Sequence, residues 1–138
     1  MKKTELGPDH FPFTKEVEVR YRDQDTLNHV NNAVFNTYFE EGRLDFAMQV
    51  PEFVQGLEEQ KSFVLVKTTI EYLGQITFPS RLIVGTGLKD RGNSSFTGVQ
   101  AIFDKESGDI KAYAESKGIW FDLKRQRPAR LPEIEGMD

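Results

Sequence analysis

The stretch DQDTLNHVNN, residues 23 to 32, gathers two aspartates, one histidine and three asparagines within ten positions. It follows KEVEVRYRD, residues 15 to 23, in which apolar and charged side chains alternate as in a strand with one buried face. It precedes NNAVFNTYFEEGRLDFAMQV, residues 31 to 50, whose apolar side chains recur at helical spacing. The sequence therefore predicts a strand, a polar loop and a long helix in that order.

The predicted helix has recognisable ends. Asn31 or Asn32 serves as its N-cap, and Pro51 stops it. Gly42 in its middle costs about 1 kcal/mol relative to alanine, which indicates close packing against another element. The following segment, PEFVQGLEEQK, is expected to be irregular.

The remainder of the chain reads as four strands, over residues 62–73, 80–90, 94–104 and 110–123. Short glycine-containing connections at Gly92-Asn93 and at residues 105–109 favour antiparallel hairpins. Small side chains are expected to share one sheet face and to let the helix lie close: Gly85, Gly87, Gly98, Ala112 and Ala114. The prediction is one α+β domain over residues 1–138, with a loose N-terminal arm over 1–13 and an irregular tail over 124–138.

Composition limits the chemistry that this chain can carry. Without cysteine, disulfides, thiolate metal sites and cysteine nucleophiles are excluded, and two histidines, His10 and His29, are too few for a multi-histidine metal site. A net charge of −4 disfavours nucleic acid as a partner, because binding its backbone needs a basic surface. A carboxylate-based reaction that uses neither metal nor cofactor is the simplest that remains.

The chain shows no sign of membrane insertion or export. No apolar run approaches the ~20 residues that span a bilayer, and the polar start MKKTELGPDH lacks the apolar core of a signal peptide. We therefore expect a cytoplasmic protein without membrane contact. One long helix cannot cover both faces of such a sheet, so a second copy is expected to complete a homodimer.

The segment VRYRDQDTLNHVNNAVFNTYFEEGR, residues 19–43, resembles the strand–loop–helix signature of hotdog-fold thioesterases of the 4-hydroxybenzoyl-CoA thioesterase-like family. The "D…HVNN" pattern is most similar to the long-chain acyl-CoA thioesterase branch and the plant acyl-ACP thioesterases. The resemblance runs over about residues 13 to 132. It implies a hotdog fold, in which a five-stranded antiparallel sheet wraps around one long central helix. It also implies hydrolysis of an acyl-CoA thioester at a homodimer interface, with dimers able to pair into tetramers.

The same resemblance implies roles for particular residues. Asp25 falls on the family's catalytic acid, acting as nucleophile or general base. Asn32 falls on the position whose backbone N–H faces the thioester carbonyl. His29 and Asn31 lie between them, where relatives place polar groups toward the reaction centre. Phe35 stands where relatives often carry tyrosine, so a hydroxyl is missing at that substrate-binding position.

Elementary chemistry agrees with such a site. A thiolate whose conjugate acid has a pKa of about 8.5 leaves without a strong general acid. A carboxylate and hydrogen-bond donors aimed at the developing oxyanion therefore suffice. Helix N-termini supply such donors together with a positive dipole end. The alternative interpretation gives these residues no catalytic role: Asp25 is a turn residue, His29 is structural and Asp23 is a solvated acid at the strand end.

The hairpin LKDRGNSSF, residues 88–96, is a second candidate. In relatives, basic and hydroxyl residues around this turn meet the nucleotide end of coenzyme A. Four residues here suit phosphates: Lys89, Arg91, Ser94 and Ser95. An ordinary solvated hairpin is the alternative.

Two other functions are alternatives to the thioesterase hypothesis. The same fold hosts hydratases and dehydratases of acyl thioesters, but their catalytic loop is spaced differently. A non-catalytic acyl-thioester binding module would tolerate loss of the acid, yet Asp25 is present. Because carrier proteins are acidic like this chain, coenzyme A is favoured over acyl carrier protein as the acyl donor.

Overall fold

The computed structural model describes residues 2–134. Its first part contains two 3-10 turns, η1 (Lys3–Glu5) and η2 (Pro8–His10), then β1 (Phe13–Glu18) and a third turn, η3 (Tyr21–Asp23). Two helices follow, α1 (Asn32–Gln49) and α2 (Pro51–Glu58). The rest is strands: β2 (Lys61–Tyr72), β3 (Arg81–Arg91), β4 (Ser95–Asp104), β5 (Ile110–Asp122) and the short β6 (Arg127–Pro128).

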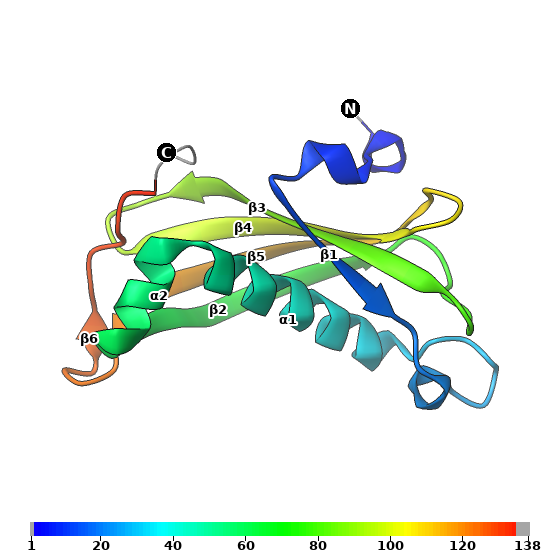
Figure 1. The fold of residues 1–138 in the computed structure, drawn as a ribbon, viewed down its shortest axis with the longest axis horizontal. Helices are drawn as coiled ribbons and strands as arrows, with labels where there is room; N and C mark the ends of the chain where they lie inside the picture. The colour runs from blue at the N-terminus through cyan, green and yellow to red at the C-terminus, as the bar shows by residue number, and fades with distance from the viewer. Residues whose placement is uncertain (1, 135–138) are drawn as a thin grey trace.

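The five long strands form one antiparallel sheet in the order β1-β3-β4-β5-β2, and β6 pairs with the end of β5. Helix α1 lies lengthwise against one face of this curved sheet, in contact with β1, β3 and β4 (Figure 1). The N-terminal turns lie on the opposite face (Figure 1). The α+β class and the hotdog architecture are therefore confirmed.

Helix α1 begins and ends where its local chemistry dictates. The side chain of Asn31 is the N-cap and accepts a hydrogen bond from the N–H of Ala33 at 2.9 Å. One stripe of the helix is buried against the sheet: Phe35, Tyr38, Phe39, Gly42 and Phe46. Gly42 makes the close approach that its position predicts, because a β-carbon there would lie 2.6 Å from a methyl group of Val84.

The segment after α1 is helical, and the prediction of an irregular piece is wrong. Pro51 ends α1 but occupies the first turn of α2, where proline fits because its missing N–H would have no partner. Phe53 of this helix packs edge-on against Phe63 of β2, with ring centroids 4.4 Å apart. The sole tryptophan, Trp120, covers Gly56 in the same cluster.

The small residues of the later strands do not share one face, contrary to expectation. Ala112 and Ala114 face α1 and belong to its core cluster. Gly85 and Gly87 point to the outer face instead, where Phe11 and Pro12 lie over them. Strand side chains alternate between faces, so the stripe divides between the two sides of the sheet.

Both ends of the chain pack against the sheet within the described residues. In place of a loose arm, residues 2–12 form η1 and η2, and Phe11 contacts Phe103 with ring centroids 6.0 Å apart. In the tail, β6 pairs with β5, and Leu131 and Ile134 are buried. Residues 1 and 135–138 of the predicted arm and tail lie outside the described residues.

Candidate active site

The chain leaves the sheet earlier than the alternating pattern predicts. Strand β1 ends at Glu18, and η3 turns the chain, so Tyr21 is exposed and does not continue the strand. Asp23 is not the solvated strand-end acid that we expected, since only 1% of it is exposed. Its carboxylate accepts hydrogen bonds from Arg20 and from the Tyr38 hydroxyl.

Asp25 begins a tight turn whose residues 25–28 are exposed to solvent. Its N–H donates to the carbonyl of His29 at 2.8 Å. Its Oδ1 accepts from the N–H of Leu27 at 2.9 Å and of His29 at 3.4 Å, while Asn28 adopts a left-handed φ of 62°. The side chain is thus a turn residue. Within residues 2–134 its Oδ2 accepts no hydrogen bond, which leaves this oxygen available for chemistry.

The start of α1 presents a donor beside this turn. The oxygen of the Asn31 side chain is occupied by capping Ala33. The N–H of Asn32, the first residue of the helix, has no acceptor in the described part of the chain. A free N–H at the positive end of an 18-residue helix is suited to an oxygen that gains negative charge.

Asp25, His29, Asn32 and Phe35 all line one cavity of about 360 Å³. The structure therefore brings together the three predicted catalytic positions and one predicted substrate-binding residue. The remaining walls are mostly apolar, with Gln75 the polar exception: Leu27, Val30, Tyr72, Leu73, Gly74 and Gln75. A polar end next to an apolar wall suits a thioester carbonyl joined to an acyl group.

Tyr72 is a lining residue that sequence reasoning missed. Its ring meets Phe35 edge-on with centroids 5.2 Å apart, and its hydroxyl donates to the Asn32 carbonyl oxygen at 3.4 Å. A phenol hydroxyl therefore enters the cavity from β2, although position 35 lacks one. The only sequence signal is an aromatic residue at the end of a predicted strand, and it does not indicate that this strand end lies against the loop.

The predicted phosphate-binding hairpin is far from this cavity within one chain. It joins β3 to β4 at the end of the sheet opposite the loop of Asp25 (Figure 1). Lys89 forms an ion pair with Glu115 at 3.3 Å. The Arg91 guanidinium donates to the carbonyls of Leu131 and Pro132, at 2.8 and 2.9 Å. Ser94 lies in the same turn and Ser95 begins β4, both outside the cavity.

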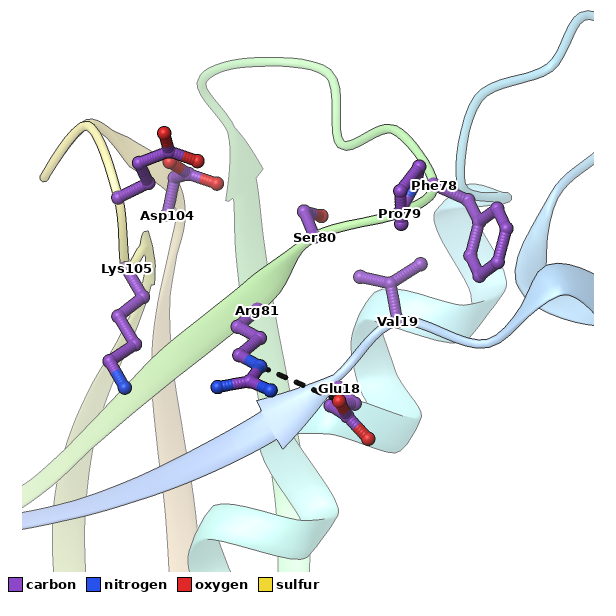
Figure 2. A pocket seen from close by; sticks show the side chains of 9 residues that line it. Glu18, Val19, Phe78, Pro79, Ser80, Arg81, Asp104 and Lys105 are labelled. Atoms are coloured by element: carbon purple, nitrogen blue, oxygen red, sulfur yellow. Dashed lines mark ion pairs between the residues drawn. The ribbon is translucent and has the colours of Figure 1, made fainter.

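A larger cleft, of about 710 Å³, lies elsewhere, between the β2–β3 connection and the turn after β4 (Figure 2). Its cations are already paired: Arg81 with Glu18 at 3.5 Å and Lys105 with Glu16 at 3.1 Å. Of these two, only the smaller cavity combines an available carboxylate oxygen with a free helix N–H.

Among residues 2–134, no three carboxylate or histidine side chains gather in an arrangement that could hold a metal ion. Over the same range, no helix has both the length and the apolar character needed to cross a membrane.

Residues 12–134 match the model of the Thioesterase-like superfamily. The chain belongs to this superfamily. A thioesterase from Thermus thermophilus, solved in complex with coenzyme A and Zn, is 33% identical over 89% of this chain and 93% of its own, with a TM-score of 0.75. No curated protein matches the sequence.

Other solved thioesterases share the fold. YbaW Probable Thioesterase from Escherichia coli is 26% identical over 86% of this chain and 89% of its own, with a TM-score of 0.79. A 1,4-dihydroxy-2-naphthoyl-CoA thioesterase from Synechocystis is 21% identical over 87% and 89% of the two chains, with a TM-score of 0.75. The protein is therefore a thioester hydrolase with a hotdog fold, as the resemblance in residues 19–43 predicts.

Proposed function

We propose that this thioesterase hydrolyses an acyl-CoA thioester in the cavity at the start of α1, with Asp25 as nucleophile or general base. One observation carries the proposal. The free Oδ2 of Asp25 and the free N–H of Asn32 belong to residues that line the same cavity. A nucleophile or base and an oxyanion donor are the two functions that thioester hydrolysis requires.

The reaction follows from these two groups. As a nucleophile, Asp25 attacks the thioester carbonyl, expels the CoA thiolate and forms a mixed anhydride, which water then hydrolyses. As a general base, it removes a proton from water, which attacks the carbonyl directly. In both routes the N–H of Asn32 stabilises the oxyanion of the tetrahedral intermediate. His29 lines the same cavity, and we assign it the role of orienting the attacking water.

Coenzyme A is the acyl carrier that the comparisons favour. The Thermus thermophilus thioesterase was solved with coenzyme A bound, and it shares a third of its residues with this chain. The hairpin of residues 88–96 is too far from the cavity of its own chain to contact a substrate there, because β3 spans about 35 Å. Lys89, Ser94 and Ser95 would therefore meet the nucleotide of a bound coenzyme A only from a second copy of the chain.

A homodimer is the second part of the proposal, and β2 supports it. This strand is one of the two edges of the sheet, and its bulged residue Val66 is 64% exposed. Leu44 and Met48 expose further apolar surface on α1. Exposed apolar side chains beside an unpaired edge strand are typical of a surface that a partner covers. A second copy there would complete the walls of the cavity.

The decisive experiment is thiol release from a panel of acyl-CoA esters by the wild type and by Asp25→Asn. Because the chain has no cysteine, a thiol reagent detects only the product. We expect kcat to fall about a hundredfold or more in Asp25→Asn, with KM little changed. Asp9→Asn, a matched change at an exposed aspartate of η2, is the control and should match the wild type.

Other outcomes would point to the competing functions. Wild-type turnover by Asp25→Asn would rule out the assigned nucleophile or base. Binding of CoA esters without hydrolysis by the wild type would favour a binding module. Conversion of an enoyl-CoA to a hydroxyacyl-CoA without thiol release would favour a hydratase.

A further inference from the structure

Asp23 is the most completely bonded carboxylate near the candidate active site, although it does not line the cavity. Its Oδ2 accepts from the Tyr38 hydroxyl at 2.7 Å and from the Arg20 N–H at 2.9 Å. Its Oδ1 accepts from Nε and Nη2 of Arg20, at 3.0 and 2.8 Å. Burial pushes the pKa of Asp23 upward, but the hydrogen bonds from Arg20 and Tyr38 prevail and hold that pKa below its usual range.

The backbone of Asp23 joins the two ends of the catalytic loop. Its carbonyl accepts a hydrogen bond from the N–H of Asn31, the N-cap of α1, at 3.0 Å. The next residue, Gln24, forms a β-bridge with Val30. Residues 23–24 and 30–31 thus pair and form the neck of the loop. Asp25 follows directly on one side of this neck, and Asn32 follows Asn31 on the other, so the neck holds the two residues to which we assign catalytic roles.

The Asp23 carboxylate ties this neck to the helix and to the chain after β1. Tyr38 lies on the buried face of α1, whose first N–H is the proposed oxyanion donor. Arg20 lies between β1 and η3, so its guanidinium holds Asp23 from the sheet side. The loop, the helix and the end of the strand thus meet at one buried carboxylate.

We propose that Asp23 is a positioning residue for thioester hydrolysis, because its carboxylate, held by Arg20 and Tyr38, fixes Asp25 relative to the N–H of Asn32. This inference rests on the proposed function. A shift of about 1 Å between reacting groups can cost about a hundredfold in rate. Loosening the neck should therefore lower kcat far more than it alters substrate binding.

Tyr38→Phe is the sharpest test, because it removes one donor from Asp23 and preserves the shape of the packed ring. We expect kcat to fall about tenfold while KM changes less than about twofold. Tyr113→Phe, at a tyrosine of β5 in the cluster on the outer face of the sheet, is the matched control and should retain wild-type kcat. Asp23→Asn should lower kcat further, because the amide nitrogen that replaces one carboxylate oxygen cannot accept a hydrogen bond and the charge that pairs with Arg20 is lost.

A double-mutant cycle separates positioning from a general structural role. In the Asp25→Asn background, Tyr38→Phe should have almost no further effect on kcat, because the carboxylate that it positions is gone. A purely structural role would lower kcat by the same factor in both backgrounds. Wild-type kcat in Tyr38→Phe, or equal factors in the two backgrounds, would overturn the positioning role.

The two proposals fail in distinguishable ways. If Asp25→Asn abolishes turnover while Tyr38→Phe matches the wild type, the positioning role alone is wrong. If Asp25→Asn retains wild-type turnover, the proposed function falls, and the role of Asp23 falls with it.

Discussion

Gln100 of β4 reaches the backbone of α1 at Gly42. Its Nε2 donates to the carbonyl oxygen of Phe39 at 2.9 Å and to Oγ1 of Thr86 at 3.0 Å. A β-carbon at Gly42 would lie 2.9 Å from that same Nε2. This contact limits the distance between α1 and the sheet, and so contributes to where the helix N-terminus lies.

Gly42→Ala should destabilise the protein although alanine is the better helix former. Helix propensity favours alanine by about 1 kcal/mol, but overpacking against Val84 and Gln100 costs about 1 to 3 kcal/mol. We expect a net loss of about 1 kcal/mol in the free energy of unfolding, measured by urea denaturation. Glu41→Ala, at the exposed neighbour, should be neutral or slightly stabilising. A more stable Gly42→Ala would mean that α1 moves away from the sheet with no loss in the free energy of unfolding.

Asn31→Asp should separate stability from activity. Aspartate caps helices as well as asparagine does, and its charge interacts favourably with the helix dipole, so the free energy of unfolding should hold or rise. The same charge lies beside the developing oxyanion at Asn32, so kcat should fall about tenfold. Asn31→Ala should instead lose about 1 kcal/mol of stability. Full activity in Asn31→Asp would argue against oxyanion stabilisation at this helix end.

Tyr72 should influence which acyl groups are hydrolysed. Tyr72→Ala removes the ring that packs on Phe35 and enlarges the apolar wall, so kcat/KM should shift toward bulkier acyl groups across a CoA ester panel. Tyr72→Phe keeps the ring and loses only the 3.4 Å hydrogen bond to the Asn32 carbonyl, so its acyl preference should match the wild type. The same acyl preference in all three proteins would place the acyl group elsewhere.

Stability should fall in acid because of Asp104. The N–H of Ser107 donates to its Oδ2 at 2.8 Å and lowers the pKa of the carboxyl. A group with a lowered folded-state pKa stabilises fully above its unfolded pKa of about 3.9. As the pH falls below that value, the unfolded chain takes up the proton first and stability is lost.

Asp104→Asn should therefore reduce the decline in the free energy of unfolding between about pH 5 and pH 2, measured by urea denaturation at each pH. The asparagine oxygen can still accept from Ser107, so the turn should persist. Asp9→Asn is the matched charge change on an exposed turn and should follow the wild-type curve. An unchanged slope in Asp104→Asn would show that this hydrogen bond has little influence on acid unfolding.

Val66→Lys should disrupt the proposed dimer. A lysine at the bulge of the edge strand β2 places a charge where the partner would pack. We expect a monomer by light scattering and a parallel loss of turnover. Leu123→Lys, at an exposed leucine beyond β5, should leave the mass of the assembly unchanged. A fully active monomer would show that one chain holds the complete site.

The order of the elements could be predicted from the sequence because local patterns encode it, whereas the catalytic role of residues 23–32 rests on the family resemblance and stays a prediction. The alternation before Asp23, the N-cap at Asn31 and the helical stripe after it are properties of neighbouring residues. What escaped prediction depends on contacts between distant segments. Asp23 is buried because Tyr38 reaches it across the loop, and Tyr72 enters the cavity because β2 ends beside it.

Two other misses have local causes. In the sequence pattern Pro51 indicates a helix stop, but proline is equally suited to begin the next helix. The pattern of small residues predicts the glycines of β3 on the helix side, but Gly85 alternates with Val84 and faces Phe11. Because glycine carries no apolar side chain, the sequence pattern does not indicate which face it belongs to.

Trp120 is the sole tryptophan of the chain, and it is buried between α2 and the end of β5. In the sheet it pairs with Phe63, whereas Tyr72 of the cavity pairs with Ala112, about 25 Å away along β5. Its intrinsic fluorescence therefore reports whether α2 is docked, at the end of the sheet remote from Asp25 of the same chain. Any variant in the loop of Asp25 that loses turnover with an unshifted emission maximum has kept this end of the molecule folded.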